Sequence, residues 1–420
     1  MRFIVRAAAA LFGLAVAAGC AGSGATPIRG AADRPAVEPM ADPTQRLRVA
    51  QFNVALFANE ADGVRQRLAG GADENARRIA AIIQRQRPDL LLLNEVDFDA
   101  EGRLADVLQR EYLQVGQFGE APIHYPYRYF APVNTGVASG LDINGDGQVG
   151  GPGRLYGEDA FGFGLHPGQY GMLVLSRFPI DAERVRTFRL LKWSALPEPR
   201  RPRHPDGRWF HADAVWSQLR LSSKSHWDVP VRTPGGVLHF LVSHPTPPSF
   251  DGPEDRNGRR NADELALWRH YLDDADGRAA WLCDDAGQCG GLAADAPFVL
   301  AGDLNNDRND GSGHHEAIVA LIEHPRVLRH PFPTSAGGVH AARTGHPVNA
   351  RHRGDPAHDT SQFGPPSGNL HLDYVLPSSG FRVVDSGVFW PTPGQPGADW
   401  AEASDHRMVW VDLVPANALP

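Results

Sequence analysis

Polar side chains able to bind a metal or move a proton stand at the ends of short apolar runs in this sequence. They are Asn53, Glu95, His244, Asp303, Asn305, Asp405 and His406. A polar residue just beyond a buried strand lies at the edge of a sheet, where loops build functional sites. Carboxylates and carboxamides are the oxygen ligands that Mg²⁺ and Mn²⁺ prefer, and histidine exchanges protons near neutral pH. This combination fits the hydrolysis of a phosphate ester.

The runs that precede these residues have the length and composition of β-strands. We predict strands at 47–54, 90–97, 172–176, 238–243, 298–303, 370–376 and 408–413. Between them, Ile79, Ile82 and Ile83 recur at helical spacing before Pro88, which predicts an amphipathic helix. Leu265 to Leu272 and Ile318 to Ile322 predict two more helices. Strands alternating with helices and hairpins favour an α/β fold with packed sheets.

Seven motifs in this order resemble those of the endonuclease/exonuclease/phosphatase superfamily. They are QFNV (51–54), LLNEVD (92–97), SRFPI (176–180), SHPTPP (243–248), GDLNND (302–307), LDYVLPS (372–378) and SDH (404–406). Each motif is weak by itself, but the ordered set spans roughly residues 47–415. The resemblance implies a four-layer sandwich in which two mostly antiparallel sheets pack together between helices.

The resemblance also implies a role for each site residue. Glu95 would be the principal ligand of Mg²⁺ or Mn²⁺, completed by Asn53 and Asp405 directly or through water. The other implied roles concern the phosphoryl group and the attacking water: His406 pairs with Asp373 and activates water or stabilises the phosphorus, Asp303 orients or deprotonates water, and Asn305 and His244 donate to phosphate oxygens. Which residue takes the proton stays open.

The substrate stays open too, because the superfamily acts on nucleic acids, phospholipids such as sphingomyelin, and small phosphate esters. A net charge of −8 argues against binding nucleic acid through a broad basic surface. A rival hypothesis is a cell-surface binding protein that kept the fold without catalysis. No feature of the sequence indicates a protein partner.

The first twenty residues indicate export. Arg2 and Arg6 precede an apolar run that ends at Ala-Ala-Gly-Cys, which resembles the lipobox of bacterial lipoproteins, with Cys20 as the acylated residue. Residues 21–46 are rich in Ala, Gly and Pro and predict a flexible tether to a single catalytic domain at 47–415. We therefore expect a protein that is lipid-anchored outside the cytoplasm, at the outer membrane, or secreted.

Three stretches look like long ordered insertions in that domain: 115–170, 190–232 and 331–369. The first contains Asp142, Asn144 and Asp146, spaced as in the first half of a calcium loop, although its twelfth position is Gly153. A structural Ca²⁺ site and a turn held by Asx hydrogen bonds both fit this pattern. The second contains Trp209, Trp216 and Trp227, which we interpret as a hairpin.

Two cysteines remain beyond the export segment. Cys283 and Cys289 stand six positions apart in a loop that contains glycine. Outside the cytoplasm such a pair favours a disulfide bond.

Overall fold

The structure is a computed structural model that describes residues 46–417. These residues belong to one compact unit, Asp42–Pro420. The predicted signal peptide, Cys20 and nearly all of the tether lie outside the described residues. Within 46–417, no helix is long and apolar enough to cross a membrane.

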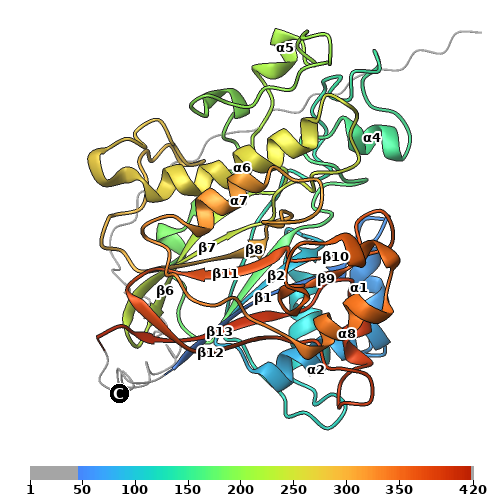
Figure 1. The fold of residues 1–420 in the computed structure, drawn as a ribbon, viewed down its shortest axis with the longest axis vertical. Helices are drawn as coiled ribbons and strands as arrows, with labels where there is room; N and C mark the ends of the chain where they lie inside the picture. The colour runs from blue at the N-terminus through green and yellow to red at the C-terminus, as the bar shows by residue number, and fades with distance from the viewer. Residues whose placement is uncertain (1–45, 418–420) are drawn as a thin grey trace, which may run out of the picture. The chain divides into compact units, whose positions relative to one another are not determined.

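Two large mixed sheets form the framework (Figure 1). The six-stranded sheet has the order β12 (Phe381–Val388), β13 (Val409–Pro415), β1 (Leu47–Leu56), β2 (Leu90–Val96), β4 (Met172–Ser176), β3 (Tyr127–Phe130). The five-stranded sheet has the order β11 (Asp373–Pro377), β8 (Phe298–Asp303), β7 (Gly236–Ser243), β6 (His226–Thr233), β5 (Arg186–Thr187). Among the strands of these two sheets, β1 with β2 and β7 with β8 pair in parallel, and the other neighbouring strands pair antiparallel. A two-stranded ribbon joins β9 (Ser361–Gln362) to β10 (Asn369–Leu370).

The helices are α1 (Gly63–Leu68), α2 (Glu74–Gln86), α3 (Arg103–Val107), α4 (Arg154–Glu158), α5 (Asp213–Trp216), α6 (Arg256–Leu272), α7 (His315–Ile322) and α8 (Ala336–Thr344). Helix α2 confirms the predicted helix: the Asp73 carboxylate caps it by accepting from the Ala76 N–H. It ends at Gln86, after which Arg87 has a φ of 48°. Helices α6 and α7 confirm the other two.

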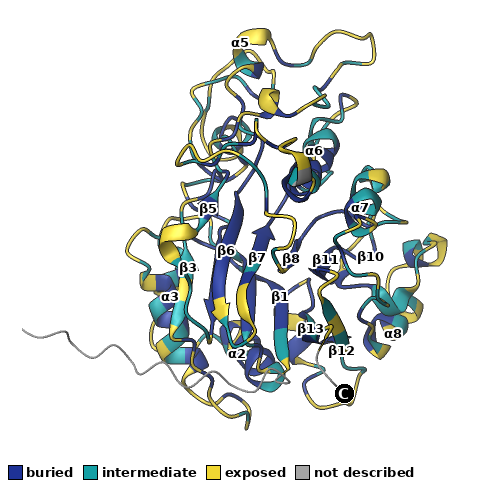
Figure 2. Cartoon of the chain, turned by 90° about the vertical axis from the view of Figure 1, so that its left-hand side faces the viewer, coloured by how far each residue is buried: buried dark blue, intermediate teal, exposed yellow. Residues whose placement is uncertain are grey.

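Three apolar cores separate the layers, so the predicted four-layer sandwich is confirmed. One core fills the space between the sheets, where Val49 and Leu92 of one sheet share a cluster with Phe240 of the other. A second lies between the six-stranded sheet and α2, and a third between the five-stranded sheet and helices α6 and α7. Figure 2 shows the central strands buried along most of their length. Burial on both faces explains why these strands read as continuous apolar runs.

The hairpin expected between Trp209 and Trp227 is wrong. Asp213–Trp216 form the short helix α5, and the hairpin is instead β6 with β7, paired from His226↔Ser243 to Thr233↔Gly236. Most of β6 therefore falls inside the stretch 190–232 that we expected to be an insertion. Polar residues interrupt the apolar pattern of this strand, so the sequence did not predict it.

Two polar side chains of β6, His226 and Asp228, are buried but hydrogen-bonded. The His226 ring lies 2.6 Å from the Ser222 hydroxyl, and Asp228 accepts from the Tyr271 hydroxyl at 2.6 Å and contacts His239 at 2.8 Å. Because buried polar groups are tolerated when they are paired, a strand can contain His and Asp without an apolar pattern.

The strand predicted at 370–376 is divided. Asn369–Leu370 pair with β9, whereas Asp373–Pro377 form β11 beside β8. The other expected strands are present. The predicted disulfide between Cys283 and Cys289 is confirmed as well.

Candidate active site

Two parallel strands bring the first pair of site residues to one edge of the six-stranded sheet. Asn53 of β1 lies opposite Asn94 of β2, so Glu95 is one residue further along the same edge. Glu95 has a left-handed backbone with a φ of 59°. Non-glycine residues with positive φ are uncommon and cluster at functional sites, where the surrounding structure holds them.

Asn94 connects this edge to the other sheet. Its Oδ1 accepts hydrogen bonds from Gln51 Nε2 at 2.8 Å and from the Asp303 N–H at 3.0 Å. In the five-stranded sheet, Asp303 of β8 pairs in register with Asp373 of β11. The carboxylates from both sheets therefore meet at one end of the sandwich.

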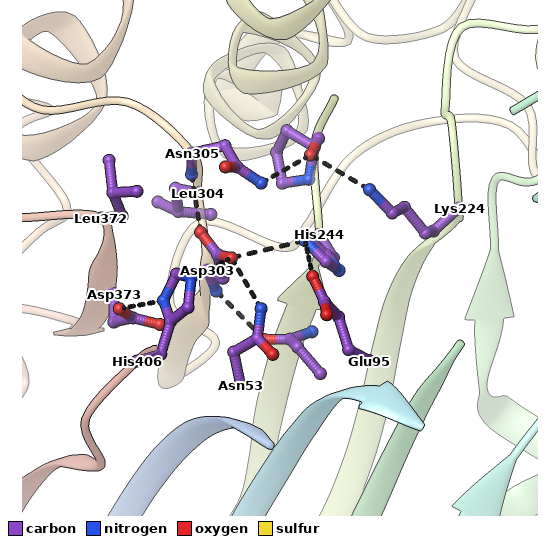
Figure 3. A network of polar contacts seen from close by, with 12 residues as sticks. Asn53, Glu95, Lys224, His244, Asp303, Leu304, Asn305, Leu372, Asp373 and His406 are labelled. Atoms are coloured by element: carbon purple, nitrogen blue, oxygen red, sulfur yellow. Dashed lines mark hydrogen bonds and ion pairs between the residues drawn. The ribbon is translucent and has the colours of Figure 1, made fainter. Parts of the chain in front are cut away.

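Asp303 lies at the centre of a cluster with five other polar side chains (Figure 3). Three of them contact its carboxylate, and the other two contact the histidines among those three. Asp303 Oδ2 accepts from Asn53 Nδ2 at 3.0 Å and lies 3.4 Å from His244 Nε2 and 3.6 Å from His406 Nε2. His406 Nδ1 lies 2.8 Å from Asp373 Oδ2, and His244 Nε2 lies 4.0 Å from Glu95 Oε1. The structure thus brings together predicted site residues that are up to several hundred positions apart in the sequence.

The opposite charges of this cluster stabilise one another. Burial opposes charge on His406, but the carboxylates of Asp373 and Asp303 raise the pKa of this imidazole to about 10. Burial would also raise the pKa of Asp303, yet His406 and the hydrogen bond from His244 hold that pKa below its usual value. The structure therefore favours an imidazolium beside a carboxylate at neutral pH.

Glu95 has the electrostatic environment of a metal ligand. Burial raises the pKa of this carboxyl to about 7, helped by the charges of Asp303 and Asp405 and opposed by the Asn53 side chain and His406. Ligand atoms of Glu95, His244 and Asp303 lie within 4.8 Å of one another, as do those of Asp303, Asp373 and His406. A divalent cation beside Glu95 would supply the positive charge that the carboxylate lacks, so the residues present fit Mg²⁺ or Mn²⁺.

Asn305 and Asp405 are placed at the edge of this cluster. Asn305 has a φ of 52°, its N–H donates to Asp303 Oδ1 at 3.0 Å, and its Nδ2 donates to the Pro245 carbonyl at 3.1 Å. Asp405 lines the same cavity with an exposed side chain, outside both groups of closely spaced ligand atoms. Asp405 and Glu95 line the same cavity, so Asp405 would complete the shell of a metal at Glu95 directly or through water.

The cluster opens into one cavity of about 720 Å³. Its walls include the loops after β7 and β8, the segment before β13, helix α4 and the start of α6. Apolar rings also line it, among them Phe57, Tyr170 and Phe363. The cavity is large enough for a small organic ester or part of a larger one.

Two residues of the site escaped the sequence analysis. The Thr360 hydroxyl donates to Asp373 Oδ2 at 2.7 Å, which is the same oxygen that His406 Nδ1 contacts. Lys224, just before β6, is 6% exposed and lines the cavity. A lysine directly before a buried strand was the signal for Lys224, but β6 itself had not been recognised.

The calcium-like loop lies away from the closely spaced ligand groups. The Asp142 carboxylate accepts from the N–H groups of Gly145, Asp146 and Gly147, at 2.8 to 3.1 Å. Asn144 Oδ1 accepts from the Asp146 N–H at 3.0 Å. These are Asx hydrogen bonds, and the Ca²⁺ site stays a prediction.

The sequence from residue 50 to residue 406 matches the profile of the Endonuclease/Exonuclease/phosphatase family. The match covers most of the chain and includes every motif of the site. The chain belongs to the endonuclease/exonuclease/phosphatase family.

Solved structures of this family resemble the chain at low identity. An endonuclease/exonuclease/phosphatase from Beutenbergia cavernae is 21% identical with a TM-score of 0.47, covering 88% of this chain and 72% of its own. Sphingomyelinase C from Streptomyces griseocarneus is 18% identical with a TM-score of 0.43, covering 88% and 99%. A mannosyl-6-phosphatase from Bacteroides thetaiotaomicron is 15% identical with a TM-score of 0.41, covering 88% and 99%. No curated protein matches the chain.

Membership rests on the match over residues 50–406, because these structural likenesses are weak. It supports a divalent-metal-dependent hydrolase of phosphate esters in general terms.

Proposed function

We propose that this protein is an extracytoplasmic hydrolase that cleaves phosphate esters with Mg²⁺ or Mn²⁺ bound at Glu95. The observation that carries the proposal is the buried cluster in which Asp303 contacts Asn53, His244 and His406 at the base of a cavity. The complete set of acid, base and ligand groups favours an enzyme over a binding protein that has lost catalysis.

Glu95, with Asn53 and Asp405, would hold the metal, which would supply polarisation of a phosphoryl oxygen. The chain's own groups then divide the remaining work. Asp303, whose carboxylate stays ionised, orients and deprotonates the attacking water. His406, held by Asp373 with its Nε2 facing Asp303, donates a hydrogen bond to the phosphoryl group, and His244 and Asn305 complete the donors.

We also propose that residues 1–20 export the chain and that Cys20 anchors it by a lipid. The support is the charged, apolar and small-residue pattern of that segment. Labelling of the full chain with a fatty-acid analogue in cells would test this, and Cys20→Ser should abolish the label. Label that persists in the variant would disprove the anchor.

A substrate panel tests the proposed reaction. Plasmid DNA, RNA, bis-p-nitrophenyl phosphate, p-nitrophenyl phosphate and sphingomyelin would be offered with Mg²⁺, Mn²⁺ or Ca²⁺ to the wild type and to His406→Ala. Cleavage of any member that requires metal and falls by about 10²-fold or more in the variant supports the proposal. Cleavage that is equal in both proteins would contradict it.

A further inference from the structure

Lys224 is a buried lysine that forms no ion pair with a carboxylate among residues 46–417. Its side chain enters the site from the side of Glu95 and His244, as Figure 3 shows. The Nζ atom has one contact, 3.5 Å from the Pro245 carbonyl oxygen, although an ammonium group can donate three hydrogen bonds. Because the residue is 6% exposed and lines the cavity, its remaining donors are available to a molecule bound there.

Arg260 of α6 brings a second cation to the same wall. Its Nε donates to the Leu221 carbonyl at 2.9 Å, and its Nη2 donates to the carbonyls of Phe161 and Arg220 at 2.6 and 3.0 Å. These bonds fix the guanidinium without neutralising it. Arg260 lines the cavity. Burial lowers the pKa of Lys224, and the charge of Arg260 adds to that lowering.

Within the described residues, neither cation forms an ion pair with a carboxylate. Glu264 is the acidic residue that offsets the charge of both most strongly, but its carboxylate is hydrogen-bonded elsewhere: Oε1 accepts from the Ser223 N–H at 2.7 Å and Oε2 from the Thr246 N–H at 2.6 Å. Glu95 and Asp303 offset the charge of Lys224 from further away, and these are the groups that a bound metal would engage.

Two other cations of the cavity have carboxylate partners. Arg154 of α4 pairs with Glu158 at 2.6 Å, and Arg256 pairs with Glu254. Arg220 also lines the cavity and donates to Asn134 Oδ1 at 2.6 Å. A buried charge without a partner costs free energy, which an anionic ligand would recover. Lys224, which lies on the side of Glu95 and His244, places such a charge next to the catalytic cluster.

We propose that Lys224 and Arg260 form a subsite for a second phosphate group, so that the preferred substrates carry another phosphate besides the one that is cleaved. The inference deepens the proposed function and rests on it. The second phosphate could belong to a small bisphosphate or to the next linkage of an oligonucleotide. A terminal phosphate is dianionic and a phosphodiester linkage is monoanionic, but both present anionic oxygens to the two cations.

A matched substrate pair tests this subsite: the p-nitrophenyl ester of thymidine 5′-phosphate, with and without a 3′-phosphate. We expect kcat/KM to be at least about tenfold higher with the 3′-phosphate, since a charge-assisted hydrogen bond typically contributes that much. In Lys224→Met and Arg260→Met this ratio should fall by about tenfold. Arg154→Met, which removes a paired cation of the same cavity, should keep the wild-type ratio, and so should the charge-conserving Lys224→Arg.

Oligothymidylate distinguishes the two sources. Preference for the 3′-phosphorylated ester over oligothymidylate of equal concentration assigns the subsite to small bisphosphates, and the reverse assigns it to a polynucleotide. A wild-type ratio near one for the ester pair, or a ratio unchanged in both Met variants, would overturn the subsite.

Binding separates failure of this inference from failure of the proposed function. Calorimetry would compare thymidine 3′,5′-bisphosphate with thymidine 5′-phosphate on the chelator-treated protein. The subsite predicts about tenfold tighter binding of the bisphosphate and loss of this advantage in Lys224→Met, even if no ester is hydrolysed. Equal affinities in the wild type would refute the subsite while leaving hydrolysis at Glu95 and His406 untouched.

Discussion

At the scale of single residues, the site depends on the pairing of His406 with Asp373. This bond fixes which imidazole nitrogen faces Asp303, and the two carboxylates keep the ring charged. Thr360 donates to the same oxygen of Asp373, so the carboxylate itself has a fixed orientation. The histidine is therefore positioned by buried groups that do not face the substrate.

Asp373→Asn tests this pairing. The amide keeps the shape of the side chain but removes the negative charge that raises the pKa of His406, and it can orient the ring wrongly. We expect kcat to fall by about 10²- to 10⁴-fold with a small change in KM. Thr360→Val, which removes only the hydroxyl that holds Asp373, should cost much less. An Asn variant with wild-type kcat would show that the pairing is structural only.

At the scale of secondary-structure elements, the sequence was informative where a strand buried on both faces consists mainly of apolar residues. The runs at 298–303 and 172–176 coincide with β8 and β4 because apolar residues fill most of their positions. Strand β6 is buried too, but it was missed because His226, Asp228 and Pro230 interrupt its apolar pattern, and the partners of Asp228 come from later parts of the chain. Lys224, which precedes β6, was missed for the same reason.

The strand-end residues were predictable because their order carries the family motifs. Their mutual distances were not, since Asn94 and Asp303 meet only when the two sheets pack. Likewise, Asp373 begins strand β11 and Thr360 stands directly before β9, and the sequence separates the two residues by a loop.

Strand β6 also predicts a pH dependence of stability. Burial lowers the pKa of His226 from 6.5 to about 4. Below pH 6.5 the unfolded chain binds a proton that the folded chain refuses, so this contribution is complete above pH 6.5 and is lost as the pH falls toward 4. We expect His226→Gln to lower the free energy of unfolding at pH 7.5, with a difference from wild type that shrinks by up to about 3 kcal/mol by pH 4.5.

Urea unfolding at several pH values measures this difference. The exposed His124 offers a control, because His124→Gln should follow the wild type throughout. Curves for wild type and His226→Gln that stay parallel across this range would contradict the assignment.

The disulfide loop after α6 is an element whose loss should affect stability alone. Arg186 Nη2 and Nη1 donate to the carbonyls of Gln288 and Gly290 at 2.8 and 2.9 Å, so the loop stays attached without the bond. Closing a loop of this size stabilises a fold by about 2 kcal/mol. The double variant Cys283→Ser, Cys289→Ser should lose that much in denaturant unfolding and keep wild-type kcat/KM. A loss of kcat/KM would show that the loop influences the cavity, although it contributes no residue to the wall.

At the scale of the whole molecule, the two sheets together position one cluster of charged side chains. Glu95 and Asn53 come from one sheet, and Asp303 and Asp373 come from the other. The central core that packs the sheets together therefore also sets the distances within the site. A metal held at this junction would bind both sheets, so its removal should lower stability as well as activity.

The most direct test of the account is to measure metal binding and hydrolysis on the same samples. Chelator-treated wild type and Glu95→Gln would be titrated with Mn²⁺ by calorimetry, and the rate of bis-p-nitrophenyl phosphate hydrolysis would be followed at each concentration. We predict that the wild-type rate rises from near zero with the same midpoint as binding, and that Glu95→Gln loses both. Full hydrolysis by the chelator-treated protein, or Mn²⁺ binding and rate that Glu95→Gln leaves unchanged, would contradict a metal-dependent centre at Glu95.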